Sequence, residues 1–258
     1  MRATSRELRR PSALVLALGL VCAAGPATAF RPDVTPGGLL DVRLVIPSAE
    51  TVAQNGGFGK GPYGRGSDGS SDTPWQAEEL AVFARAQLAP PLMASVHLQS
   101  VEGQLLDVVE SYIRYRPVST SRVRFAVKAG AFFPRLSFEN EGVAWSNLYT
   151  LTNSAANTWV AEEVRHIGID AQVEHRGRTW KTSLTAGPAF ASDRSGVALS
   201  YRGFVFNDRN VGLFGEIDVP GNQFRLPMGA EPFHEIDGRP GISAGVLAQR
   251  RDATRLAL

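Results

Sequence analysis

Hydrophobic and polar residues alternate along most of the chain. Between residues 122 and 133, for example, Val123, Phe125 and Val127 alternate with Arg124 and Lys128. Because successive side chains of a β-strand point to opposite faces, this alternation predicts strands with one hydrophobic and one polar face. The predicted strands are residues 39–46, 78–88, 92–101, 108–117, 122–133, 164–176, 179–190, 197–206 and 242–252.

The predicted connections between these strands are of two kinds. The short ones contain Pro90-Pro91, Ser119-Thr120-Ser121 and Gly177-Arg178, and the long ones are residues 47–77, 134–163 and 208–241. Short turns at one end of a sheet and long loops at the other are typical of membrane β-barrels. Counted from the strand at 39–46, however, loop 208–241 is predicted at the short-turn end.

Two architectures keep the hydrophobic faces of such strands away from water. In a soluble β-sandwich these faces pack against each other, whereas in an outer-membrane β-barrel they contact lipid and the polar faces line the interior. Predicted strands of about 9–13 residues are longer than most soluble strands and suit tilted strands that cross a bilayer. We therefore predict an all-β fold, a transmembrane antiparallel β-barrel or partial barrel of about eight or nine strands, with the soluble sandwich as the alternative.

Residues 1–29 have the features of a secretory signal peptide. Four arginines lie among the first ten residues, a hydrophobic stretch follows from Ser12 to Ala24, and Ala27-Thr28-Ala29 forms an A-x-A cleavage site. We expect cleavage between Ala29 and Phe30, export to the outer membrane, and a barrel domain at residues 30–258. The only cysteine, Cys22, lies in the leader, so the mature chain is expected to form neither disulfides nor thiolate metal sites.

The formal net charge of +2 depends on this leader. The first 29 residues hold four of the 27 Lys and Arg and one of the 25 Asp and Glu, so the remainder carries a net charge of −1. This balance argues against a nucleic-acid partner bound through bulk charge.

Positive charge is concentrated on the polar positions of the predicted strands. The hydrophobic positions carry almost no charge, and Arg165 and Arg250 lie near strand ends, from which long side chains can reach water. The basic residues on polar positions are Arg43, Arg85, Arg114, Arg116, Arg122, Arg124, Lys128, Arg176, Lys181, Arg202 and Arg251. The acidic ones are Asp41, Glu79, Glu110, Asp170 and Glu174.

Several short segments carry a resemblance to a known family. They are GGFGK (56–60), ESYIRYR (110–116), KAGAFFP (128–134), ENEGVAW (139–145), WVAEE (159–163) and EIDGRPG (235–241). Together with the leader, they resemble Gram-negative porins, in particular the phosphate-selective porin-like group. The resemblance implies an outer-membrane channel, often a homotrimer, with positive residues along an anion path.

The chain departs from that group in length and in its last residue. Those porins have about 16 strands and usually end in an aromatic residue, whereas this chain offers about half as many strands and ends at Leu258. We therefore expect either a truncated member or a small barrel, whose interior would be largely filled by side chains.

The most prominent group of basic residues lies on two adjacent predicted strands. Their short connection places Arg114, Arg116, Arg122, Arg124 and Lys128 on one wall, and Lys181 and Arg202 are further candidates for lining a pore. Arginine offers forked donors to phosphate and carboxylate, and anion pores use such residues for selectivity. The alternative is that they pair with Glu110, Asp170 and Glu174 and only stiffen the wall; Arg116 and Arg122 could also meet lipid headgroups at the turn.

Loop 134–163 is the candidate for a constriction inside a barrel. Its Glu139, Glu141, Glu162 and Glu163 would then face the basic wall, although the same residues fit a solvated external loop equally well. Residues 154–163 could form a short helix, with Ser154 as its N-cap.

The predicted function is passive diffusion of small hydrophilic solutes, with a preference for anions. No spacing of Ser, His and Asp indicates an active site, so no enzyme, catalytic residue, cofactor or metal is predicted. The expected partners are outer-membrane lipid, the solutes and further copies of the chain. A non-conducting structural or ligand-binding barrel and a soluble periplasmic sandwich that binds a ligand are the alternatives.

Overall fold

The computed structural model describes the part of the chain that forms one sheet. The structure describes residues 31–44, 46, 49–51, 75–101, 104–134, 154, 165–192, 212–214, 239–250 and 255–257. For residues 43, 75–79, 101, 104, 105, 192 and 255–257 it describes the backbone and not the side chain. Apart from Arg31, all of these residues belong to one compact unit, Pro32–Leu258. No helix among them is long and apolar enough to cross a membrane.

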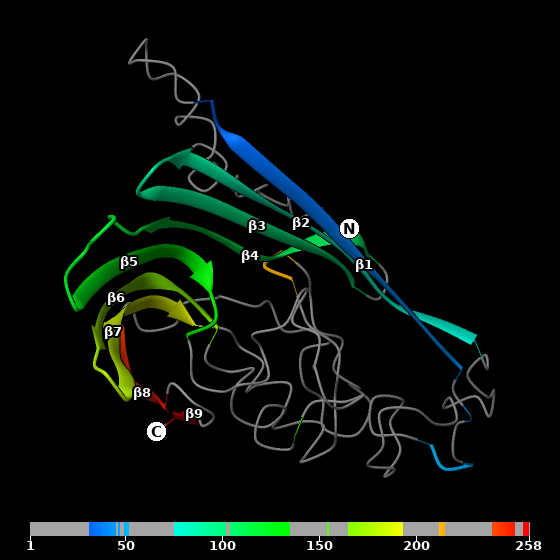
Figure 1. Cartoon of the computed structure of the whole chain (residues 1–258). Coiled ribbons are helices and arrows are strands. Elements are labelled where there is room, and N and C mark those ends of the chain that lie inside the picture. Colours follow the sequence, from blue (N-terminus) through cyan, green and yellow to red (C-terminus); the bar gives the residue numbers. More distant parts are fainter. Residues whose placement is uncertain are drawn as a thin grey trace, which may run out of the picture. The chain divides into compact units, whose positions relative to one another are not determined.

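The described strands form one antiparallel sheet in chain order (Figure 1). They are β1 (Asp33–Leu44), β2 (Trp75–Ala89), β3 (Leu92–Val101), β4 (Gln104–Tyr115), β5 (Val123–Phe132), β6 (His166–Arg176), β7 (Trp180–Ser192), β8 (Gly241–Arg250) and β9 (Arg255–Ala257). The prediction of an all-β antiparallel fold is therefore confirmed. β1 and β9 lie at the two edges of the sheet, with no pairing between them in the described residues, so closure into a barrel stays a prediction.

The connections alternate between the two ends of the sheet, and the three long ones lie at the same end, together with the short connection 102–103. The short-turn end has residues 90–91, 116–122, 177–179 and 251–254, and the other end has residues 45–74, 102–103, 133–165 and 193–240. Because β7 pairs directly with β8, the connection 193–240, which includes residues 208–240 of the predicted loop, lies at the long-loop end, not at the short-turn end as counted from the sequence. That count included a strand predicted at 197–206; these residues, like 155–163 of the predicted helix, lie outside the described part of the chain.

The two faces of the sheet differ in both polarity and exposure. Many large hydrophobic side chains of the first face are 40% or more exposed, whereas several polar side chains of the second are buried. Those exposed are Val34, Leu40, Val42, Leu44, Leu80, Val82, Leu106, Tyr115, Val123, Phe125, Ile169, Val173, Trp180, Leu184, Phe190, Ile242 and Val246. Those buried are His97, Gln99, Asp107, His166, Asp170, Glu174 and Ser183. We call the first the hydrophobic face and the second the polar face.

Glycines on the polar face accompany the strong curvature of the sheet along β5–β8 (Figure 1). Gly130 lies opposite Gly168 and has a φ of 140°, and a Cβ there would come within 2.2 Å of the Ser111 carbonyl oxygen. A Cβ at Gly187 would overlap the carbonyl oxygen of Ile169. The close approach of neighbouring backbones therefore requires glycine at these positions.

Candidate functional site

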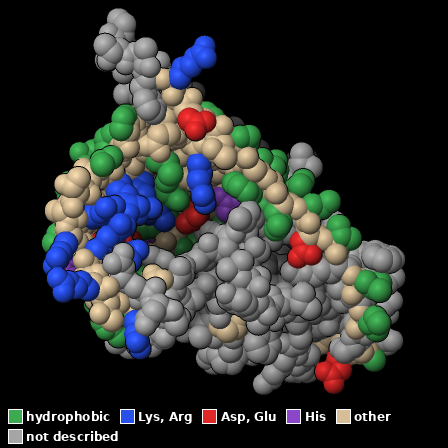
Figure 2. All heavy atoms as spheres, viewed as in Figure 1, with side chains coloured by type: hydrophobic (Ala, Val, Ile, Leu, Met, Phe, Trp, Pro, Cys, Tyr) green, Lys and Arg blue, Asp and Glu red, His purple; other side chains and the backbone are tan. Residues whose placement is uncertain are grey.

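The charged residues of β4–β7 form rows across the polar face. Arg114 lies opposite Lys128, which in turn lies opposite Asp170. Toward the short-turn end the following pair on this face is Ala126 with Gln172, and the one after it is Arg124 with Glu174. The alternating pattern thus places Arg114, Arg124 and Lys128 on one wall, and Figure 2 shows Lys and Arg side chains gathered over this curved part of the sheet.

Lys128 is held by one carboxylate and two aromatic rings. Its Nζ lies 3.8 Å from Glu110 Oε1, 4.1 Å from the centroid of the Tyr112 ring and 4.2 Å from that of the Phe132 ring. Glu110 is itself held, because its Oε1 accepts a hydrogen bond of 3.0 Å from the Phe133 amide. An ammonium group over two ring faces and beside a carboxylate is strongly fixed, so Lys128 belongs to the wall's own structure.

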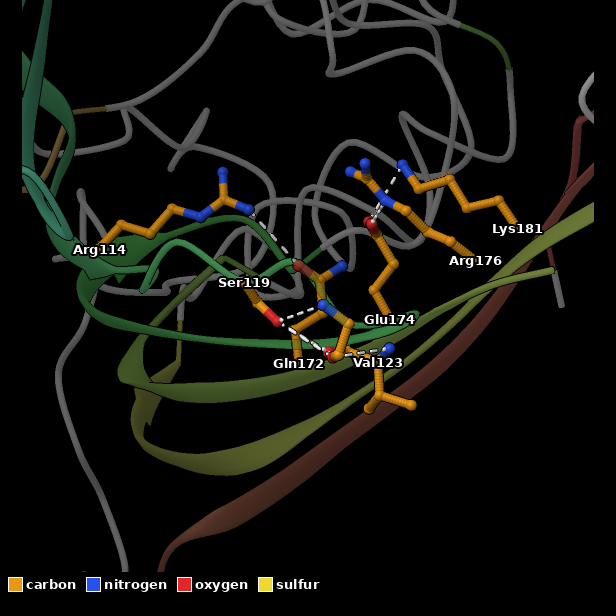
Figure 3. A network of polar contacts seen from close by, with 8 residues as sticks. Arg114, Ser119, Val123, Gln172, Glu174, Arg176 and Lys181 are labelled. Atoms are coloured by element: carbon orange, nitrogen blue, oxygen red, sulfur yellow. Dashed lines mark hydrogen bonds and ion pairs between the residues drawn. The ribbon is translucent and has the colours of Figure 1, made fainter.

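Glu174 binds two cations at the short-turn end of the sheet. Its Oε1 lies 2.5 Å from Arg176 Nε and its Oε2 lies 3.1 Å from Lys181 Nζ, as Figure 3 shows. The Glu174 side chain is 10% exposed, while those of its partners are about one third exposed. Three charged groups are thereby reduced to one net positive charge.

Asp170 occupies the middle of the polar face. Its Oδ1 accepts a hydrogen bond of 3.3 Å from the Ser243 hydroxyl of β8 and lies 3.9 Å from His166 Nε2. The ring of His166 packs at an angle against Phe132, with centroids 4.9 Å apart. The hydrogen bond between Ser243 and Asp170 thus links β6 to β8 across β7, the strand between them.

Arg114 and Arg124 are the other two cations of this wall. Arg114 reaches across β5 and donates a hydrogen bond of 3.5 Å to the neutral side-chain oxygen of Gln172 (Figure 3). Arg124 forms no ion pair among the described residues, and its Nε is buried without a hydrogen-bond partner there. A guanidinium near polar groups but without a carboxylate partner can attract an anion, and of the predicted residues Arg124 fits this role best.

A further functional group, Asp107, was missed by the sequence reasoning. Simple alternation from Glu110 assigns Asp107 to the hydrophobic face, but the register shifts between His97 and Leu98, and Asp107 pairs with Gln99 on the polar face. The residue is 4% exposed and accepts hydrogen bonds from the amides of Val108 and Phe214. A β-bulge of this kind cannot be read from period two alone.

Asp107 belongs to a seam where β5 leaves β4. The two strands pair only from Ser111 to Tyr115, so the first half of β4 has another neighbour on this side. The Leu213 amide donates a hydrogen bond of 2.8 Å to the Val108 carbonyl, and Arg165 Nη1 lies 3.4 Å from the Val109 carbonyl. Residues 212–214 are the orange segment beside β4 in Figure 1.

The side chain of Arg165 does not lie where the sequence predicted it. We expected its side chain to reach water from a strand end, but it is 1% exposed and lies over the Phe133 ring at 5.6 Å. The residue lies just before β6, where the polypeptide returns beside β4. Its guanidinium therefore packs against the seam beside β4.

The remaining predicted site residues are distributed as follows. Arg116 and Arg122 are exposed at the two ends of the turn between β4 and β5. Glu139, Glu141, Glu162, Glu163, Arg202, Ala29 and Phe30 lie outside the described residues, so the constriction and the cleavage site stay predictions. In the described part of the chain, no three His, Asp or Glu residues converge as a metal site would require.

No model of a protein family matches the chain, and no curated protein or solved structure shows significant similarity to it. The porin resemblance therefore stays a prediction.

Proposed function

We propose that the sheet is the wall of an outer-membrane β-barrel that passes small hydrophilic solutes and prefers anions. The observation that carries this proposal is the contrast between the two faces. Leu184 is 54% exposed on the hydrophobic face, whereas Glu174 is 8% exposed on the polar face. In water this arrangement is unfavourable, but in a barrel the hydrophobic face contacts lipid and the polar face lines the interior.

The height of the hydrophobic face supports the same proposal. Trp180 and Phe190 are both exposed on this face near opposite ends of β7. With a rise of ~3.3 Å per residue and a strand tilt of about 40°, they are separated by roughly 25 Å of height, the thickness of the apolar band of outer-membrane barrels. Aromatic residues are also typical of the two borders of that band.

The anion preference follows from the charges of the polar face. The polar face of β4–β7 carries five cations and four carboxylates. The cations are Arg114, Arg124, Lys128, Arg176 and Lys181, and the carboxylates are those of Asp107, Glu110, Asp170 and Glu174. Lys128, Arg176 and Lys181 pair with carboxylates, whereas Arg124 forms no ion pair among the described residues, so the preference depends most on Arg124.

A non-conducting barrel is the second candidate. The ion pairs and aromatic rings around Lys128 and Glu174 occupy much of the polar face, and the interior of a small barrel is filled by such side chains. Both candidates place the sheet in the outer membrane. They differ in whether water and ions pass through the barrel.

Recording from the protein in planar bilayers tests the proposal. We expect stepwise conductance and a reversal potential that favours anions. Substitution of Arg114→Gln with Arg124→Gln should shift the reversal potential toward cations, whereas Arg178→Gln with Arg250→Gln, an equal loss of charge near the short-turn end, should shift it less. Membrane insertion without conductance would support the non-conducting barrel, and a polypeptide that stays monodisperse without detergent would contradict both candidates. Cross-linking in the membrane tests the trimer that the resemblance implies.

A further inference from the structure

The short-turn end of the sheet from β4 to β8 presents exposed arginines. Arg116 and Arg122 flank the turn between β4 and β5, Arg178 lies in the turn between β6 and β7, and Arg250 ends β8; all four are exposed. The turn residues 116–122 and 177–179 contain no Asp or Glu. We call these four residues the basic rim.

A layer of aromatic side chains lies beside the basic rim on the hydrophobic face. Trp180 is 40% exposed, Tyr115 is 42% exposed and Phe125 is 52% exposed. The rings of Tyr115 and Phe125 contact each other with centroids 6.1 Å apart. Trp and Tyr prefer the boundary between hydrocarbon and headgroups, because their rings are hydrophobic and their N–H or O–H groups are polar.

The register joins the two features. Trp180 pairs directly with Arg250, so this guanidinium projects from the hydrophobic face next to an exposed indole. Arg178 lies two residues before Trp180, in a turn closed by the hydrogen bond of 2.8 Å from the Gly177 amide to the Trp180 carbonyl. An anion bound at this place therefore lies at the border of the hydrophobic face. A phospholipid has the same arrangement, because its phosphate group adjoins its acyl chains.

We propose that the basic rim binds the phosphate groups of anionic phospholipids in the leaflet at the short-turn end. This inference rests on the proposed membrane location but does not depend on conduction. Arginine donates two parallel hydrogen bonds to phosphate oxygens, and basic residues near an anionic membrane surface attract its headgroups. The chemistry of the site is that of a lipid surface, because hydrophobic, aromatic and basic groups lie in adjacent layers.

Trp180 offers a reporter inside this surface. A background in which Trp75, Trp145 and Trp159 are replaced by Phe leaves Trp180 as the only tryptophan of the chain. The full protein in this background is inserted into phosphatidylcholine vesicles that contain an equal fraction of either brominated phosphatidylglycerol or brominated phosphatidylcholine. Bromine quenches nearby indoles, so we expect stronger quenching by the anionic lipid and no loss of the difference on addition of inorganic phosphate.

Arg178→Gln with Arg250→Gln should remove most of this lipid preference, by roughly tenfold in relative affinity. Arg178→Lys with Arg250→Lys should retain part of it, and Arg114→Gln with Arg124→Gln should leave it unchanged. Equal quenching by the two lipids, or a preference that survives the Gln substitutions, overturns the inference while leaving the channel intact. Failure of the parent protein to insert into any vesicle, judged by the absence of a heat-modifiable band, overturns the proposed function together with the inference.

Discussion

The two faces of the sheet bury opposite kinds of side chain. On β6, Val173 is 49% exposed while its neighbour Glu174 is 8% exposed. A sheet of a soluble sandwich shows the reverse, because its hydrophobic face packs against a second sheet. The alternation of residues therefore shows that the sheet has two faces. The burial of the side chains indicates that the polar face, not the hydrophobic face, lies inside the fold.

The largest expected effect comes from placing charge on the hydrophobic face. Leu184→Arg puts a guanidinium near the middle of β7; in the proposed barrel this is the bilayer centre, where the charge lowers the unfolding free energy by about 2–4 kcal/mol. Thr185→Arg places the same group on the polar face and should cost less than about 1 kcal/mol. Denaturant titration in lipid vesicles measures both, and equal costs would contradict the assignment of the faces.

A smaller effect is expected from adding a methyl group to the polar face. Gly130→Ala introduces a Cβ against Ser111 and Tyr112 at a φ of 140°, which should lower the unfolding free energy by about 1–3 kcal/mol. The reverse change at the preceding residue, Ala129→Gly on the hydrophobic face, should cost about 0.5–1 kcal/mol through backbone entropy. If Gly130→Ala is neutral in the same titration, the close approach of β4 and β5 is wrong.

The smallest effect concerns the ion pairs at the short-turn end. Glu174→Gln leaves Arg176 and Lys181 without their carboxylate and should cost about 1–2 kcal/mol, since both partners are partly solvated. Lys181→Gln keeps the contact between Glu174 and Arg176 and should cost about 0.5 kcal/mol. Glu174→Gln also removes one negative charge from the wall, so we expect a reversal potential that favours anions more strongly; a shift toward cations would contradict the proposed role of this wall.

Much of the fold could be predicted because alternation persists along each strand. The strand predicted at 92–101 is observed as Leu92–Val101, and the one at 122–133 as Val123–Phe132. At β1 the prediction of 39–46 began late, because Gly37 and Gly38 and the preceding Pro36 interrupt the pattern. Gly37 is tolerated there because the ring of Phe83 lies over it, a contact between strands that local sequence does not reveal.

The candidate site was predictable in its residues but not in their partners. Period two placed Arg114, Arg124 and Lys128 on one face, and the alternatives of anion binding and internal pairing were left open. The contacts show that Lys128 pairs with Glu110 and that Arg114 donates a hydrogen bond to Gln172, while anion binding stays a prediction. Asp107 and Arg165 escaped prediction because a bulge and a contact between distant segments determine their positions.

The seam beside β4 has a consequence for the order of assembly. Tight hairpins such as β2–β3 and β6–β7 join residues that are close in sequence, and such contacts form early because little chain entropy is lost. The seam is completed only by Arg165, which is 56 residues from Val109, and by Phe214, which is 107 residues from Asp107. The amides of Leu213 and Phe214, which bond the Val108 carbonyl and the Asp107 carboxylate, are therefore expected to become protected late during refolding, and nascent chains that end before residue 213 would lack both bonds.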